Sequence, residues 1–343
     1  MTTKSNFTAA AVPKSRTSRL LKLGGLAGRV AGNVVAEGSK RWVRGEAAPL
    51  SELVLTQKNL THVADKLARM RGAAMKMGQL LSMDAGTLLP AELATVLARL
   101  QAQGMVMPKT QLLNALESNW GESWMEQFSY FSFEPVAAAS IGQVHRARLE
   151  SGEELAIKVQ FPGVAQSIDS DIDNVVSLLR ISGLIPRGLD LDDLIAEARR
   201  QLHLEADYLA EAQHINQYNA VVQGFRSSAS LLMPSCHEAL TSTDILSMSF
   251  IEAEALDTWL KRKPEDAARI LALMLELFFT EMLEYQLMQT DPNPANYQID
   301  PQSGRLVLLD FGAVRRFDTG FTQRYKHAID MAIARSREGL QDA

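Results

Sequence analysis

Three polar motifs occur along the chain in a fixed order, and this order restricts the fold more than any other feature. Lys158 closes the apolar run Leu155-Ala-Ile-Lys, Asp291 and Asn296 stand five residues apart beside two prolines, and Asp310-Phe311-Gly312 follows a short apolar run. Between them the patterns predict a hairpin with its turn at Ser151-Gly152, a helix over 192–219, a buried strand over 244–251, an apolar helix over 267–286 and a strand over 305–309. Each motif alone is common in ordinary loops, whereas the ordered set is not.

This order of elements is that of a protein-kinase-like domain, so the sequence predicts an α+β fold of that kind. In such domains a lysine on a strand contacts the α- and β-phosphates of ATP, which matches Lys158. The spacing of Asp291 and Asn296 places the first beside the phosphoryl acceptor and the second on a magnesium ion. The prolines at 292 and 294 predict that this loop is extended rather than helical.

Four further motifs make the resemblance specific. They are Lys76-Met-Gly-Gln79, Glu205-Ala-Asp207, Met288-Gln-Thr-Asp-Pro-Asn293, and an alanine-rich run, Ala137–His145, that stands where a glycine-rich phosphate loop is expected. With them the chain resembles the UbiB (AarF-type) family of atypical kinases over about 19–317. The residues around Asp291 are similar to the corresponding motif of the mitochondrial coenzyme Q kinase-like branch of that family.

The resemblance implies a role for each matching residue, with ATP and Mg²⁺ as ligands. It implies that the phosphates are covered by Ala137, Ala138, Ala139 and Ser140, and that Lys158 contacts them and pairs with Glu211. It implies an adenine hinge made of Ser249, Phe250, Ile251 and Glu252. Mg²⁺ is then held by Asn296 and Asp310, and Asp291 is the candidate base. The helix with Lys76 and Gln79 is expected to cover the acceptor site near Glu205 and Asp207.

Helical periodicity indicates how the two acids of the second motif are used. On a continuous helix over 192–219, Asp207 and Glu211 share one face. Glu205 falls instead on the apolar row of Ala198, Leu202, Leu209 and Ala212. A carboxylate on a buried row requires a cation, and Lys76 is the expected partner.

The alanine-rich run has a physical consequence for the activity. Its methyl groups crowd the loop and remove access to positive φ, so the nucleotide is expected to bind differently from its pose in protein kinases. A helix over the acceptor site excludes a folded protein substrate. Both features favour ATP hydrolysis or transfer to a small or lipid-pathway acceptor, and the resemblance implies a role in ubiquinone biosynthesis.

Two other functions stay open. Only 33 residues follow Asp310, whereas a kinase-like C-lobe has several more helices, so the chain is alternatively a pseudokinase scaffold that binds nucleotide and partner proteins. A small-molecule kinase of the antibiotic phosphotransferase type would share Asp291 and Asp310 but does not predict the Lys76 motif.

Four regions are expected: a basic arm over 1–46, a helical extension over 47–130, a kinase-like N-lobe over 131–250 that includes the helix with Glu205, and a short C-lobe over 251–343. The arm carries a charge of +7 and the remainder −12. A basic arm on an acidic body favours an anionic membrane surface as partner, and the lack of base-reading motifs disfavours nucleic acid.

No run of 18 apolar residues and no signal-peptide pattern is present, and Cys236 is the single cysteine. These features predict a cytoplasmic, peripherally membrane-associated protein without disulfides. The resemblance implies quinone-biosynthesis proteins or lipid intermediates as partners, and it leaves a homodimer open.

Overall fold

The computed structural model of the chain describes residues 8–9, 67, 70–84, 105–181, 191–291, 293–337 and 339. Apart from Thr8 and Ala9, the predicted basic arm lies outside the described residues, as do 47–66 and 85–104 of the predicted helical extension. The chain divides into two compact units. The first unit is 1–147 with 158–206, and the second unit is 148–157 with 207–343.

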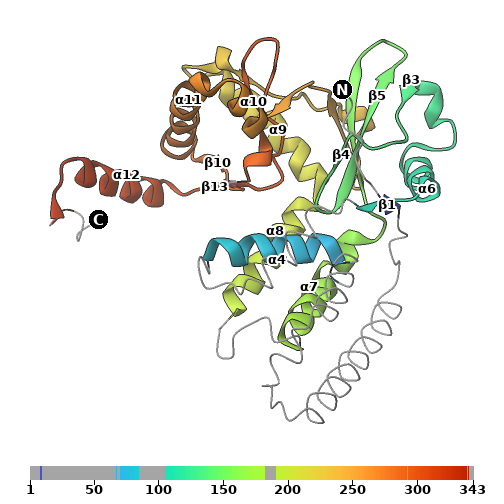
Figure 1. Cartoon of the computed structure of the whole chain (residues 1–343), viewed down its shortest axis with the longest axis horizontal. Helices are drawn as coiled ribbons and strands as arrows, with labels where there is room; N and C mark the ends of the chain where they lie inside the picture. The colour runs from blue at the N-terminus through green and yellow to red at the C-terminus, as the bar shows by residue number, and fades with distance from the viewer. Residues whose placement is uncertain are drawn as a thin grey trace, which may run out of the picture. The chain divides into compact units, whose positions relative to one another are not determined.

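Three helices of the first unit pack against one another: α4 (Arg71–Asp84), α7 (Val164–Ile181) and α8 (Asp192–Glu205) (Figure 1). Helix α4 and the residues before it bury Leu67, Met70 and Ala74 at helical spacing. Helix α7 is not among the elements predicted from sequence. It buries Ile168 and Ile172 at helical spacing, as an amphipathic helix should.

The first unit also contains six strands among its described residues. They are β1 (Thr8–Ala9), β2 (Met105–Val106), β3 (Phe128–Phe131), β4 (Ala137–Ala138), β5 (Gly142–Leu149) and β6 (Glu154–Gln160), with α6 (Lys109–Trp120) between β2 and β3. Strands β3, β5 and β6 are neighbours, and β4 pairs with β5. The predicted hairpin turn is confirmed, since Gly152 has φ +89°. The tip of the β5–β6 hairpin, Arg148–Ile157, belongs to the second unit.

The second unit begins with α9 (Tyr208–Gln223). It continues with β7 (Leu231–Leu232), β8 (Ile245–Ser249), β9 (Glu254–Ala255), α10 (Leu256–Arg262), α11 (Ala267–Thr280), a π-helical turn (Glu281–Tyr285), β10 (Leu287–Gln289), β11 (Tyr297–Ile299), β12 (Leu306–Leu308), β13 (Val314–Arg316) and α12 (Thr319–Ile333). One sheet has the order β7-β12-β11-β9, and β10 pairs with β13. Strand β8 neighbours β6, and the Phe250 N–H next to it donates to the Glu154 carbonyl at 2.9 Å.

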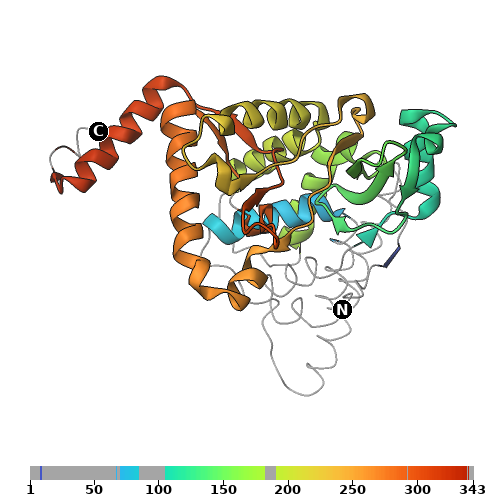
Figure 2. The ribbon, with the colours of Figure 1, turned by 90° about the horizontal axis from the view of Figure 1, so that it is seen from above.

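Helix α11 confirms the predicted apolar helix, but its apolar residues lie on two faces. Ile270, Leu273 and Leu277 are buried, whereas a second row of Leu271, Leu275 and Phe279 is exposed. Both views show α12 projecting from its unit (Figure 2). None of the helices in the described part of the chain is long and apolar enough to cross a bilayer.

Two sequence predictions about local structure are wrong. The helix predicted over 192–219 is two helices, because the backbone leaves the helical region at Asp207 (φ −94°, ψ 81°). The loop around Asn296 contains a 3₁₀ turn, Pro294–Asn296. Proline is tolerated at the first position of a helical turn, where its missing N–H would have no partner.

Candidate active site

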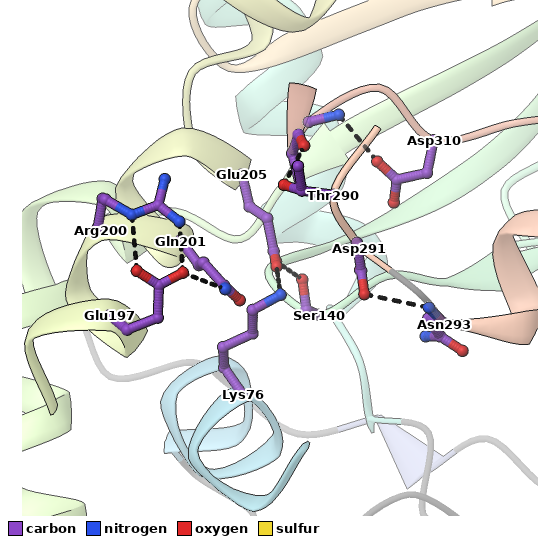
Figure 3. A network of polar contacts seen from close by, with 12 residues as sticks. Lys76, Ser140, Glu197, Arg200, Gln201, Glu205, Thr290, Asp291, Asn293 and Asp310 are labelled. Atoms are coloured by element: carbon purple, nitrogen blue, oxygen red, sulfur yellow. Dashed lines mark hydrogen bonds and ion pairs between the residues drawn. The ribbon is translucent and has the colours of Figure 1, made fainter. Parts of the chain in front are cut away.

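Two antiparallel ladders of the second unit bring the predicted catalytic residues together. Strand β10 ends just before Asp291, and its partner β13 begins just after Asp310-Phe311-Gly312. Thr290 extends this ladder, because its N–H and Oγ1–H both donate to the Ala313 carbonyl, at 2.9 and 2.7 Å. Asp291 and Asp310 therefore lie at the same end of one ladder (Figure 3).

The second ladder adds Asn296 to this group. Strand β11 starts directly after Asn296, and its antiparallel partner β12 ends two residues before Asp310. The Leu309 N–H donates to the Asn296 carbonyl at 3.3 Å, and Asn296 Nδ2 donates to the Asp291 carbonyl at 3.4 Å. The three polar residues predicted for the catalytic and metal sites thus converge in the second unit.

Phe311 of the Asp-Phe-Gly motif is fixed by α9. Its side chain is fully buried and its ring centroid lies 5.1 Å from that of Tyr218. His214, one turn before Tyr218, donates from Nδ1 to the Phe311 carbonyl at 3.0 Å, which requires the proton on Nδ1 because a carbonyl only accepts. Glu211, one turn earlier still, is buried as well.

The predicted hinge follows β8. The Ser249 N–H donates to the Ser235 carbonyl at 2.9 Å, and the Phe250 N–H is also used within the protein. Ser249 Oγ in turn accepts from the Ser235 N–H at 2.9 Å. The contact of the hinge with a nucleotide base therefore stays a prediction, and at Ser249 and Phe250 the backbone N–H groups are already used within the protein.

The alanine-rich run of the first unit is a tight turn between β4 and β5. The Ala139 N–H donates to the Gly142 carbonyl at 3.0 Å. Of the described non-glycine residues, only Gln286 and Arg335 have positive φ. The backbone of Ala137–Ser140 therefore makes no use of the conformations that glycine alone adopts easily.

Helix α4 contacts this turn closely. A Cβ at Gly72 would lie 3.2 Å from the Ser140 carbonyl oxygen and 3.0 Å from a methyl of Ile141. One turn further along α4, Lys76 Nζ lies 2.8 Å from Glu205 Oε1. The Ser140 hydroxyl donates to the other oxygen of the same carboxylate (Figure 3). Glu205 thus joins α4 to the alanine-rich turn, and the predicted Lys76–Glu205 pair is confirmed.

Asp207 has a different role from the one inferred from helical periodicity. It is the N-cap of α9, and its side chain accepts from the Ala210 N–H at 3.0 Å. The predicted shared face with Glu211 is therefore wrong, since a cap residue precedes the helix. The row that includes Glu205 holds only within α8, where Ala198 and Leu202 are buried.

Residues 99–343 match the family model described as the ABC1 atypical kinase-like domain. The chain belongs to this family. Among relatives, the protein named "Atypical kinase COQ8, mitochondrial" of Saccharomyces cerevisiae is 36% identical over 339 residues, which cover 99% of this chain and 67% of the relative. "Atypical kinase coq-8, mitochondrial" of Caenorhabditis elegans is 34% identical over 340 residues, covering 96% of this chain and 44% of the relative.

A solved structure has a similar fold over most of the chain. The complex of Rv3197 with erythromycin from Mycobacterium tuberculosis has a TM-score of 0.56 and 26% identity, and the match covers 80% of this chain and 69% of that one. The kinase-like α+β fold predicted from sequence is confirmed. This ABC1 chain spans about half to two thirds of the length of the curated relatives that it matches.

Several predicted site residues of this ABC1 chain keep the status of predictions. Lys158 belongs to the first unit and Glu211 to the second, so their ion pair is still a prediction, as are the nucleotide contacts of the alanine-rich turn. Gln79 is half-buried on α4, one turn from Lys76.

The donor atoms at Asn296 and Asp310 fit a magnesium ion. Asn296 donates from Nδ2, which leaves Oδ1 as a ligand, and Asp310 Oδ1 accepts from the Gly312 N–H at 3.0 Å, which leaves Oδ2. The described residues contain no group of three or more His, Cys, Asp or Glu that would hold a metal alone. A small set of oxygen donors suits Mg²⁺ that is bound together with substrate phosphates.

Sequence reasoning missed a buried polar chain beside the alanine-rich turn. Gln143 Oε1 accepts from the Met107 N–H at 2.9 Å, Gln143 Nε2 lies 2.8 Å from His145 Nε2, and His145 Nδ1 lies 2.8 Å from the Ser132 carbonyl. Burial lowers the pKa of His145 to about 4. The signal was available, because Gln143, His145 and the buried Ala147 alternate along one face of a strand.

Proposed function

We propose that the chain binds Mg-ATP and either hydrolyses it or transfers phosphate to a small or lipid-pathway acceptor. The observation that carries the proposal is the convergence of Asp291, Asn296 and Asp310 at the ends of two ladders. Membership of an atypical kinase-like family supports the same chemistry.

The residues have distinct roles in this proposal. Mg²⁺, when bound, neutralises charge on the phosphates. Asn296 and Asp310 hold it with Oδ1 and Oδ2. Asp291 accepts a proton from the attacking hydroxyl or water, since its carboxylate lies at the end of the same ladder. The buried Phe311 and the His214 contact fix the backbone on which Asp310 is carried.

The packing of α4 supports a small acceptor. Gly72 and Lys76 hold this helix against the alanine-rich turn, through the Ser140 backbone and through Glu205. In this proposal α4 covers the acceptor site, as the resemblance to the family implies, so a folded protein substrate would have to displace a helix that is fastened by an ion pair. A small or lipidic molecule would not.

For the biological role we propose ubiquinone biosynthesis, on the resemblance of the motifs to the coenzyme Q kinase-like branch. The partners are then quinone-biosynthesis proteins or lipid intermediates. The basic arm over 1–46 binds an anionic membrane surface in this proposal, because each basic group near such a surface contributes about 1 kcal/mol. Two relatives carry the word mitochondrial in their names, which is a statement about those proteins.

The test is nucleotide binding and phosphate release with anionic vesicles, with neutral vesicles and without vesicles. Mg-ATP should raise the melting temperature, since a ligand that binds only the native state stabilises it. Phosphate release that Asp310→Asn abolishes supports an enzyme, and binding without release supports the scaffold. Vesicle binding that persists on neutral lipid, or after deletion of 1–46, contradicts the role of the arm.

A further inference from the structure

A small pocket of the second unit contains polar groups that the proposed chemistry does not use. Its polar lining consists of Tyr218, Glu281, Gln289, Asn296, Tyr297 and Asp310. The cavity volume is ≈ 10 Å³, which is about enough for one water molecule. The pocket is thus shared between the candidate metal ligands and a set of side chains from α9, the π-helical turn, β10 and β11.

Several polar atoms in this pocket are buried without a partner. The Tyr218 hydroxyl and both polar atoms of the Gln289 side chain have no hydrogen-bond partner among the described residues. The Tyr218 hydroxyl lies near the Glu281 carboxyl without meeting hydrogen-bond geometry. Buried polar groups are normally satisfied, and one water with two to four polar neighbours would satisfy these.

Glu281 is the acid of this pocket that the proposed chemistry does not use. It is 6% exposed and begins the π-helical turn, a distortion that is frequent at functional sites. Among the described residues that line the pocket, none is Lys, Arg or His. Burial raises the pKa of Glu281 to about 8, although the nearby Tyr218 hydroxyl and the Gln289 backbone act in the opposite direction. A neutral carboxyl both donates and accepts, as a water-linked cluster requires.

The cluster contacts the chain next to all three catalytic residues. Gln289 stands two residues before Asp291, and Tyr297 directly follows Asn296. Phe311, which follows Asp310, packs its ring on Tyr218. We call the three stretches 289–291, 296–297 and 310–311 the catalytic segments.

We propose that Glu281 is the positioning residue of this site. Together with one internal water it joins Tyr218 and Gln289, and so fixes the three catalytic segments relative to one another. The inference deepens the proposed function and rests on it for the chemistry. The positioning itself is a property of the protein without ligands, and it is tested in that state.

The primary test is amide hydrogen exchange of the ligand-free protein. The probes are the amides of Leu309 and Gly312, which donate to Asn296 and Asp310, with Leu246 of β8 as an internal reference for global opening. Glu281→Leu should speed exchange at both probes about ten-fold, because it removes the hydrogen bonds of the cluster. Glu281→Gln should stay within about two-fold, since a neutral amide keeps them.

Two further variants complete the design. Glu284→Gln is the matched control, because Glu284 lies in the same π-helical turn and is exposed, and it should exchange as the wild type does. Tyr218→Phe removes one hydroxyl and should speed exchange about three-fold. If Glu281→Leu does not fold, the exchange rates of Tyr218→Phe alone test the positioning role. Equal exchange in Glu281→Leu, Tyr218→Phe and Glu284→Gln overturns the inference.

A second measurement separates this inference from the proposed function. The Mg²⁺ concentration that gives half of the thermal stabilisation by ATP should rise about ten-fold in Glu281→Leu, and not in Glu281→Gln. If the wild type shows no stabilisation by Mg-ATP, the proposed function is wrong, and the exchange rates alone decide the positioning role. If the wild type is stabilised and Glu281→Leu has the same Mg²⁺ requirement, the positioning role is wrong.

Discussion

Lys76 Nζ and Glu205 Oε1 lie 2.8 Å apart, with the two side chains only 3% and 14% exposed. A buried ion pair gains Coulomb energy but loses the hydration of both charges, so its net stabilisation is small. Removal of one partner is a different matter, because the other charge is then left buried and unpaired. The pair therefore adds little net stability, but removal of only one of the two charged residues weakens the packing of α4 on the alanine-rich turn.

Lys76→Ala is expected to lower the free energy of unfolding by about 3–5 kcal/mol, for the reason just given. The double variant Lys76→Met with Glu205→Leu should recover most of that loss, because no charge is then buried. Urea denaturation measures both. Lys261→Ala is the control, since the Lys261–Asp257 pair is exposed, and it should not change the midpoint. An equal loss in Lys76→Ala and the double variant would contradict this view.

Asp310 and Asp291 should separate binding from turnover. Asp310→Ala removes a proposed metal ligand, so the thermal shift with Mg-ATP should shrink while any shift with metal-free ATP stays. Asp291→Asn should keep the shift with Mg-ATP and lower turnover about 10²- to 10⁴-fold, the usual contribution of a general base. Calorimetry and phosphate release measure the two effects. A loss of Mg-ATP binding in Asp291→Asn would mean that Asp291 belongs to the metal site.

Ala139→Gly tests the alanine-rich turn. The Ala139 N–H closes the turn on Gly142, and glycine would give this backbone access to positive φ at a cost of up to about 1 kcal/mol. We expect a changed preference between ATP and ADP, or more autophosphorylation, measured by titration and by radiolabel transfer. Unchanged binding and phosphorylation in this variant would remove the turn from the nucleotide site.

His145 predicts a specific dependence of stability on pH. Its folded pKa of about 4 is lower than the value of 6.5 expected in the unfolded chain, so the unfolded state binds more protons between these values. The free energy of unfolding should therefore have its full value above pH 6.5. It should fall as the pH drops towards 4, with a loss on the order of 3 kcal/mol.

Denaturation curves at half-unit steps of pH measure this loss. His145→Gln should flatten the decline between pH 6.5 and 4, and His327→Gln, at an exposed position of α12, controls for the loss of a histidine. A decline of the same steepness in His145→Gln would show that another group causes it.

The sequence was sufficient for two parts of the site. The convergence of Asp291, Asn296 and Asp310 follows from short antiparallel ladders, which a strand pattern and motif spacing already indicate. The Lys76–Glu205 pair was predictable because Glu205 stands on an apolar row and needs a cation.

The remaining features depend on tertiary structure. The break at Asp207 could not be seen in the sequence, because alanine and aspartate are tolerated inside helices. Whether an aspartate lies within a helix or caps the next one depends on tertiary packing. Glu281 continues the buried row of Ile270, Leu273 and Leu277, but its partners come from distant segments, and no periodicity reveals the π-helical turn that begins there. Helix α7 is a simpler omission, since Ile168 and Ile172 carry a helical period.

Glu205 and Asp207 are read together as one signature, yet they meet separate demands. Glu205 pairs with a buried ammonium group, whereas Asp207 accepts a hydrogen bond from an N–H group in the first turn of a helix. Serine, threonine or asparagine caps a helix nearly as well as aspartate does, whereas a shorter or neutral residue at 205 leaves Lys76 stranded. The fold should therefore tolerate another capping residue at 207 far better than a neutral residue at 205, although both positions belong to one short motif.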